Sequence, residues 1–254
     1  MPQYPDVEAF AAFALAAETR AMTTHDAPRG RTRSIPERRP VAHQPATAPM
    51  GGPRALVVST AMAMNLGEPE NGCLLLADIS GYTEYMGGTE LAHAQDVVAD
   101  LLETIVNAVE PTFTLAKLEG DAAFSYASID TVNPSMMMDT VESAYFAFQK
   151  RLRDVVHATT CECDACIRIP SLDLKFFVHD GEYIVRHIAR SEELTGSDVI
   201  LVHRLAKGTA GDRIGKPAYA VYTRATLEAM AMDPSILGFV PHTETFDDLS
   251  LIHI

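Results

Sequence analysis

The stretch Cys73-Leu-Leu-Leu-Ala-Asp-Ile-Ser-Gly81 is a short, continuous apolar run that ends in two small residues. Such a run is typical of a strand that is buried on both faces of a sheet. Asp78 lies near the carboxyl end of this run, just before the small-residue turn. We therefore expect a central strand over residues 73–79 with a carboxylate at its exit.

The next segments predict two helices and a hairpin. Apolar residues recur at three- and four-residue steps over residues 91–109, which indicates an amphipathic helix that ends before Pro111. Residues 113–118 and 122–127 are predicted strands around the turn Glu119-Gly120. A second helix is expected from Ser135, as the N-cap, to about His157.

The second half of the chain predicts a further hairpin and shorter elements. Asp180-Gly181 separates two strand-like runs, residues 172–179 and 182–190, and Asp-Gly in this setting is the strongest short hairpin signal. A helix over residues 197–207 with Gly208 as its C-cap, a strand over 218–223 and a helix over 225–230 follow. This order of elements predicts an α+β fold, a mixed sheet covered by helices on one face.

Charge and composition divide the chain into a leader, a domain and a tail. The first 69 residues hold seven arginines and six acidic residues, whereas the remainder holds 13 basic and 28 acidic residues. We interpret residues 1–70 as a mostly disordered leader with one short helix over Val7–Met22, because Pro, Arg, Thr and Gly dominate residues 27–54. Its arginines are compatible with membrane or nucleic-acid contact, but a flexible or non-native leader is the simpler interpretation. Residues 71–230 form the folded domain, and 231–254 form a C-terminal segment that resembles a truncated or non-native tail.

Composition also narrows the class of protein. With 20 basic and 34 acidic residues among 254, the net charge of −14 argues against a nucleic-acid partner. The apolar run of residues 9–17 is shorter than the roughly 20 residues that cross a bilayer, so no stable membrane insertion is expected. Four cysteines are too few for a disulfide-stapled fold. We expect a cytoplasmic protein.

Two carboxylates at turns are the first candidates for chemistry. Asp78 precedes the turn Ile79-Ser80-Gly81-Tyr82-Thr83, whose backbone N–H groups suit phosphate oxygens. Asp121 follows the predicted hairpin turn of Lys117-Leu-Glu-Gly-Asp121. Carboxylates on adjacent strands are able to share two Mg²⁺ or Mn²⁺ ions and to assist phosphoryl displacement.

Three motifs in this chain resemble those of class III nucleotidyl cyclase catalytic domains. Leu76-Ala-Asp-Ile-Ser-Gly-Tyr-Thr83 looks like the first metal motif of that family, and Lys117-x-x-Gly120-Asp121 looks like the second. Leu194-Thr-Gly-Ser-Asp-Val199, with Arg204-Leu205 after it, is similar to a later family segment. The motifs occur in the family's order over about residues 72–224. The resemblance implies the family's fold, a ferredoxin-like mixed sheet with helices packed on it.

The resemblance also implies an activity and a set of site residues. The domain would act as a phosphorus–oxygen lyase that forms a cyclic 3′,5′-nucleotide and pyrophosphate from ATP, or from GTP, for signalling. Asp78 and Asp121 would bind two Mg²⁺ or Mn²⁺ ions, and the backbone of Ile79, Ser80, Gly81, Tyr82 and Thr83 would hold the triphosphate. Lys117 and Glu193 would face the purine base, and Arg204 would stabilise charge on the transferring phosphate. The family site forms between two subunits, which implies a homodimer.

The chain departs from the family pattern at particular positions. Ile200 stands where the family has an Asn that contacts the ribose, and Glu193 is one methylene longer than the usual Asp. The family's late phosphate-binding Lys has no clear counterpart. Two functions therefore stay open, an active cyclase and a non-catalytic homologue that binds a nucleotide or a protein partner as a regulator.

A cysteine cluster lies outside the cyclase pattern. Cys161, Cys163 and Cys166 fall within six positions, and His157 lies four residues upstream. Three thiolates and one imidazole would complete a tetrahedral Zn²⁺ site. A redox role is the alternative, since closely spaced thiols exchange readily, and the cluster would then make the protein a metal- or redox-sensing scaffold. Cys73 is expected in the core, and His179, His187 and His203 are assigned no role.

Overall fold

The computed structural model describes residues 14–19, 67–87, 89–188, 191–246 and 249–253. All described helices and strands belong to one of two compact units, which comprises residues 1–20 and 66–254. The disorder predicted for residues 27–54 lies outside the described residues. Within the predicted leader helix, residues 14–19 form a strand, β1 (Ala14–Thr19), so that part of the prediction is wrong. Parallel pairing of β1 with β7 (Tyr219–Thr223) outweighs the high helix propensity of its alanines.

The central strand is β2 (Glu70–Ser80), which contains the whole of the predicted run. It pairs antiparallel with β4 (Ala122–Ser128) on one side and with β5 (Asp173–Ile188) on the other. β3 (Thr114–Glu119) forms the expected hairpin with β4. β7 (Tyr219–Thr223) lies parallel to β5, which makes the sheet mixed as predicted.

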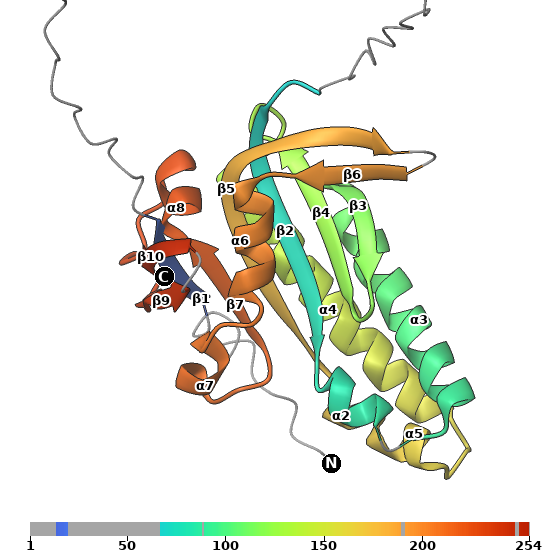
Figure 1. Cartoon of the computed structure of the whole chain (residues 1–254). Helices are drawn as coiled ribbons and strands as arrows, with labels where there is room; N and C mark the ends of the chain where they lie inside the picture. Colours follow the sequence, from blue (N-terminus) through green and yellow to red (C-terminus); the bar gives the residue numbers. More distant parts are fainter. Residues whose placement is uncertain (1–13, 20–66, 88, 189–190, 247–248, 254) are drawn as a thin grey trace, which may run out of the picture. The chain divides into compact units, whose positions relative to one another are not determined.

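The remaining strands extend the sheet beyond β7 and beyond the end of β5. β1 follows β7, and β10 (Leu249–His253) and β9 (Glu244–Phe246) follow β1. β8 (Val240–Pro241) pairs with β1. β6 (Ser191–Thr195) pairs with the last residues of β5 as a two-stranded ribbon that crosses over the sheet toward β3 in Figure 1.

Long helices form where the apolar spacing predicts them, and short ones occur in the connections. α3 (Leu91–Val109) has the predicted bounds. α4 (Pro134–Ala158) begins two residues earlier than predicted, because Asn133 and not Ser135 caps it by accepting from Met136 N–H at 3.0 Å. α6 (Ser197–Leu205) is shorter than predicted, and Ala206 instead of Gly208 is its C-cap. The others are α2 (Tyr82–Met86), α5 (Asp164–Arg168), the 3₁₀ helix η1 (Ile169–Ser171), α7 (Ala210–Ile214) and α8 (Arg224–Ala229).

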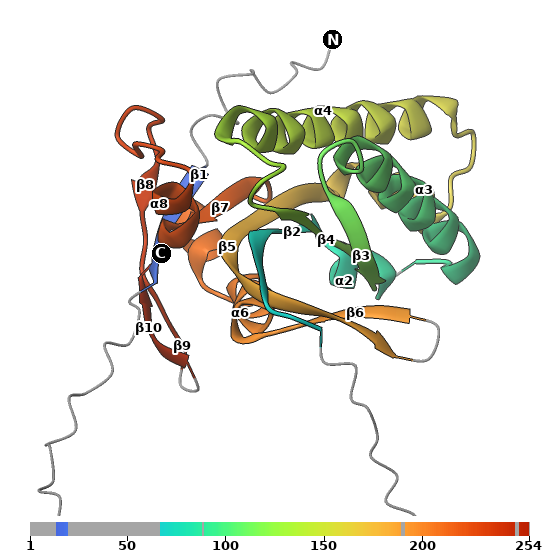
Figure 2. The same cartoon turned by 90° about the horizontal axis from the view of Figure 1, so that it is seen from above.

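Helices cover both faces of the sheet. α3 and α4 lie on one face and α6 lies on the other (Figure 2). The predicted arrangement, with helices on one face alone, is therefore wrong. The reason lies in β2, whose side chains alternate between two cores: Cys73 and Leu75 belong to the core with α3 and α4, and Leu74 and Leu76 to the core with α6.

The predicted hairpin at Asp180-Gly181 does not form. β5 runs unbroken through both residues, and Asp180 and Gly181 pair with Cys73 and Gly72 of β2. The absence of a Cβ at Gly181 permits a close approach instead of a turn, because a Cβ there would lie 2.5 Å from Cβ of Asp198. Long-range pairing with β2 overrides the local turn preference, and the hairpin forms later, between β5 and β6.

Candidate functional site

The two aspartates of the predicted metal motifs lie on neighbouring strands at the same end of the sheet. Asp78 stands opposite Ala122 in the β2–β4 pairing, one residue beyond Asp121. The Asp121 carbonyl accepts from Ile79 N–H at 3.1 Å, which fastens the hairpin turn to β2. Gly120 supplies the positive φ of 65° that the turn needs.

The electrostatics of Asp121 reflect this closeness. Burial, and then the negative charge of Asp78, raise the pKa of Asp121 to about 6, and Lys175 opposes that shift. Two carboxylates that are partly removed from water disfavour each other's ionised form. A divalent cation between them would relieve that cost, so the chemistry of this pair suits Mg²⁺ or Mn²⁺.

Lys175 is a site residue that sequence reasoning missed. It lies directly opposite Asp78 in the β2–β5 pairing, and its Nζ is 2.9 Å from Asp78 Oδ2. The sequence offered one signal for this residue: Lys175 stands between Leu174 and Phe176 and interrupts the apolar run of β5. Its positive charge makes this end of the sheet attractive to a phosphate, and its pairing with Asp78 competes with a cation for that carboxylate.

A row of polar side chains crosses the sheet at this level. Glu119, Asp78 and Lys175 follow one another across β3, β2 and β5, with Ala122 of β4 between the first two. Residues directly opposite one another on paired strands project from the same face. Asp78 alternates in step with Leu74 and Leu76, so this row faces the side that α6 covers.

The turn after β2 is tight and depends on glycine. Gly81 has a φ of 81°, and a Cβ there would lie 2.9 Å from the carbonyl oxygen of Ser171. Ser80 Oγ donates to the carbonyl of Pro217 at 2.6 Å, and Tyr85 N–H donates to the Gly81 carbonyl at 2.9 Å. These bonds fix the backbone of residues 79–83 beside Asp78.

The two residues assigned to base recognition lie together, although they are 76 positions apart in sequence. Lys117 Nζ of β3 is 3.5 Å from Glu193 Oε2 of β6 and 2.7 Å from Glu119 Oε1. The hydrogen bond to Glu119 is the main reason that the pKa of Lys117 is raised. His203 Nδ1 of α6 lies 3.2 Å from Glu119 Oε2, so sequence reasoning missed both Glu119 and His203.

α6 carries the other predicted residues. Arg204 lies in its last turn and is partly buried. Ile200, at the position of the family's Asn, is 52% exposed. Gly196 begins the helix, and its carbonyl accepts from Ile200 N–H at 3.2 Å.

The structure corrects the composition of the cysteine cluster. Cys161, Cys163 and Cys166 come together with His93 of α3, and among the described residues these four form the one group of three or more His, Cys, Asp and Glu side chains that lie close enough to share a metal ion. His157 lies exposed in the last turn of α4 and is not part of the group. The error arises because α3 and α4 pack side by side, so a histidine nearly 70 residues away is nearer to the thiols than one on the preceding turn. Cys73 is fully buried in the core, as predicted.

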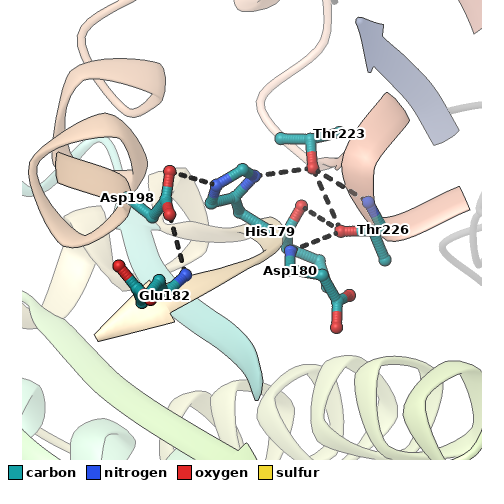
Figure 3. Close-up of polar contacts among 7 residues, drawn as sticks. His179, Asp180, Glu182, Asp198, Thr223 and Thr226 are labelled. Carbon is teal, nitrogen blue, oxygen red and sulfur yellow. Dashed lines mark hydrogen bonds and ion pairs between the residues drawn. The ribbon is translucent and has the colours of Figure 1, made fainter. Parts of the chain in front are cut away.

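A buried polar network centres on His179, which was assigned no role from the sequence. Its Nδ1 lies 2.8 Å from Thr223 Oγ1, and its Nε2 lies 3.3 Å from Asp198 Oδ1 (Figure 3). Thr226 Oγ1 accepts from Asp180 N–H at 3.0 Å. Burial would raise the pKa of Asp198, but the hydrogen bonds from His179 and Glu182 N–H lower it. Thr223 and Thr226 are fully buried, so this network joins β5 to α6 and α8 instead of forming a reaction site.

Comparisons with known proteins identify relatives and a fold. Residues 98–212 match the family model described as "Protein of unknown function (DUF2652)". The chain is 36% identical over 110 residues to the uncharacterized protein Rv2561/Rv2562 of Mycobacterium tuberculosis, a stretch that covers 43% of this chain. The match spans about half, 51%, of the length of that curated relative.

Solved structures of nucleotidyl cyclases resemble the domain. The guanylyl cyclase Cya2 matches with a TM-score of 0.54 over 74% of this chain and 92% of its own, at 15% identity. A bacterial light-regulated adenylyl cyclase matches with a TM-score of 0.51 over 74% of this chain and 52% of its own, at 9% identity. The chain has the fold of a nucleotidyl cyclase catalytic domain. The predicted α+β class, with a mixed sheet and packed helices, is thereby confirmed, and the identities establish the fold alone.

No helix among the described residues is long and apolar enough to cross a membrane.

Proposed function

We propose that this domain binds a purine nucleoside triphosphate together with two divalent cations and converts it to a cyclic 3′,5′-monophosphate and pyrophosphate. The observation that carries the proposal is the meeting of Asp78 and Asp121 at one end of the sheet, beside the Gly81 turn. The cyclase-like fold supports it, because the two solved structures named above are a guanylyl and an adenylyl cyclase.

The chain's own residues would bind and orient the nucleotide. Asp78 and Asp121 would hold Mg²⁺ or Mn²⁺, and the backbone N–H groups of residues 79–83 would face the phosphates. Bound ions lower the pKa of the ribose 3′-hydroxyl and offset phosphate charge. The ribose 3′ oxygen forms a bond to the α-phosphorus, and the bond from the α-phosphorus to the oxygen that bridges it to the β-phosphorus breaks. Pyrophosphate leaves, and the proton of the 3′-hydroxyl passes to water. Arg204 would stabilise the charge that develops on the α-phosphate.

We assign the base to the pair Lys117 and Glu193. A lysine donates hydrogen bonds and a carboxylate accepts them, which suits the N1 acceptor and the exocyclic amino donor of adenine. The 3.5 Å separation of Nζ from Oε2 supports a joint role. We therefore favour ATP over GTP.

Purified protein with ATP or GTP and Mn²⁺ tests the proposal, with cyclic product quantified by chromatography and mass spectrometry. Asp78→Asn should abolish product, since it removes a metal-binding charge. Asp139→Asn is the matched control, because Asp139 is an exposed aspartate on α4. Product from wild type and Asp139→Asn alone supports the proposal. Equal product from Asp78→Asn, or none from wild type, contradicts it.

A non-catalytic regulator is the second candidate, and two observations favour it. Ile200 presents an apolar side chain, 52% exposed, where a ribose-binding amide is expected. Lys175 already neutralises one of the carboxylates that an ion would need. Calorimetric binding of a non-hydrolysable ATP analogue without any turnover of ATP or GTP would establish this function instead.

The implied homodimer is tested by complementation. If two copies share each site, then Asp78→Asn and Arg204→Ala damage different contributions to it. Mixing the two inactive variants should restore activity, because one of the two sites in a mixed dimer would hold both wild-type residues. A monomer by sedimentation velocity with wild-type turnover would exclude the shared site.

A further inference from the structure

The cysteine cluster joins two parts of the fold that are distant in sequence. Cys161 and Cys163 lie in the connection after α4, Cys166 lies in α5, and His93 lies in the first turn of α3. The three sulfur atoms and the histidine nitrogen all lie within 4.8 Å of one another. All three cysteines are free thiols.

The distances match the edges of a metal tetrahedron. His93 Nδ1 lies 3.3 Å from the Sγ of Cys163, 3.7 Å from that of Cys161 and 3.9 Å from that of Cys166. With Zn–S bonds of about 2.3 Å and a Zn–N bond of about 2.0 Å, tetrahedral geometry places nitrogen about 3.5 Å from each sulfur. The three observed distances lie on both sides of this value.

We propose that His93 Nδ1 and the thiolates of Cys161, Cys163 and Cys166 bind one Zn²⁺ ion in a closed structural site. Thiolate and imidazole ligands select Zn²⁺ over Mg²⁺ or Mn²⁺, so this ion is distinct in chemistry from those proposed at Asp78. Four protein ligands leave no open coordination position, which is typical of a structural site. Each thiol gives up its proton to solvent when the ion binds.

The surroundings indicate what the ion would hold in place. Glu90, which precedes α3, accepts from Ala165 N–H of α5 through its Oε2 at 3.1 Å. α2 and α5 both contact α3 near its start, as Figure 1 shows. The ion would therefore fasten the α4–β5 connection to the start of α3, next to the short helix that follows the Gly81 turn. This structural role is independent of whether the domain turns over nucleotide.

A redox pair is the alternative occupant of the same thiols. A disulfide joins only two sulfur atoms, so it does not account for the nearby third cysteine or for the histidine. Here one imidazole nitrogen lies close to all three sulfurs, an arrangement that a shared cation explains and a two-cysteine exchange does not.

Metal analysis of the untagged full chain, purified under reducing conditions without chelators, tests the proposal. We expect about one equivalent of zinc per chain by elemental analysis. Replacement by Co²⁺ should give the intense d–d bands of tetrahedral coordination together with sulfur-to-cobalt charge-transfer bands. Affinity would be measured by competition with a chromophoric zinc chelator.

Single substitutions distinguish His93, the proposed ligand, from His157, the histidine that the sequence favoured. His93→Ala should weaken zinc binding at least tenfold, on the scale of losing a metal contact. His157→Ala should bind as wild type does. Cys163→Ser should also lose cobalt charge-transfer intensity, and circular dichroism would show whether each variant is folded. If His93→Ala does not fold, His157→Ala still decides, because an unchanged zinc affinity and cobalt spectrum in that variant exclude His157 as the imidazole ligand.

Three results would overturn the proposal. The first is wild-type protein that holds less than about a tenth of an equivalent of zinc and gives no cobalt spectrum after reduction, since structural zinc sites bind tightly. The second is a disulfide among the three cysteines as the isolated state. The third is an equal loss of affinity in His157→Ala and His93→Ala. None of these results depends on nucleotide turnover, so failure here and failure of the cyclase proposal are distinguishable.

Discussion

Lys175 Nζ lies 2.9 Å from Asp78 Oδ2, and the two side chains are only 20% and 15% exposed. This ion pair joins β5 to β2 at the level of the proposed metal site. The positive charge of Lys175 balances that of the Asp78 carboxylate, which is largely shielded from water and lies close to Asp121. Removing one partner of such a pair leaves an uncompensated charge in a partly dehydrated place.

Lys175→Met should lower the free energy of unfolding by about 1–3 kcal/mol without added metal. Added Mn²⁺ should raise the melting temperature of this variant more than that of wild type, because the cation replaces the lost positive charge. Thermal unfolding with and without Mn²⁺ measures both effects. Lys150→Met is the control. Lys150 pairs with Asp154 on the solvent-facing side of α4, and such a surface pair contributes at most about 0.5 kcal/mol to the free energy of unfolding. If Mn²⁺ raises the melting temperature of wild type and of Lys175→Met by the same amount, then Lys175 does not balance the charge of a cation-binding Asp78.

Asp180 should make stability depend on pH. Burial raises its pKa to about 6 in the folded protein, above its value in the unfolded chain. The neutral form is therefore favoured by folding, so its contribution is complete below about pH 4 and is lost as the pH rises through about 6. Asp180→Asn removes this dependence, and the variant should gain on the order of 2 kcal/mol relative to wild type between pH 4 and pH 7.

Urea unfolding at several pH values measures this difference. Comparing variant with wild type cancels the contributions of Asp121 and Asp173, whose pKa values burial also raises to about 6. Asp139→Asn, on the exposed side of α4, should follow the wild-type profile. A constant difference between Asp180→Asn and wild type across this range would show that Asp180 does not titrate there.

Glu193→Ala should change nucleotide preference if the proposed function is correct. Losing one hydrogen bond to a bound base costs about 1–1.5 kcal/mol, so kcat/KM for ATP should fall roughly tenfold while that for GTP changes less. Steady-state kinetics with both nucleotides measures the ratio. Glu192→Ala is the matched control, because Glu192 pairs with exposed His187 on the same ribbon. Parallel losses for ATP and GTP would argue for a general effect on the fold.

Gly181→Ala tests the unbroken path of β5. The new Cβ would lie 2.5 Å from the side chain of Asp198, which itself binds His179 and Glu182 N–H. Overpacking of this kind costs about 1–3 kcal/mol, measured as a lower denaturation midpoint. Gly87→Ala, at the end of α2 with a helical φ of −71°, is the milder comparison: its new Cβ would lie 3.1 Å from the Thr83 carbonyl oxygen, so its loss of stability should be smaller than that of Gly181→Ala. A neutral Gly181→Ala would mean that residues 180–181 have the freedom of an exposed turn.

The central elements followed from local pattern. The apolar run of β2, the spacing of α3 and the Glu119-Gly120 turn all formed where the sequence indicated, because each of them depends on contacts between near neighbours or on one buried stripe. The motif residues Lys117 and Glu193 also came together as the family resemblance implied. Lys175 was missed because an isolated lysine within an apolar strand carries no motif.

The sequence by itself determined the α+β class, the strand that carries Asp78 and the hairpin that carries Asp121. Only the tertiary structure decided that β5 continues through Asp180-Gly181, that residues 14–19 join the sheet, and that His93 is the histidine beside the cysteines. The physical reason is common to all three. Each depends on pairing or packing between segments far apart in the chain, and such contacts outweigh local turn, helix or proximity preferences of about 1 kcal/mol or less.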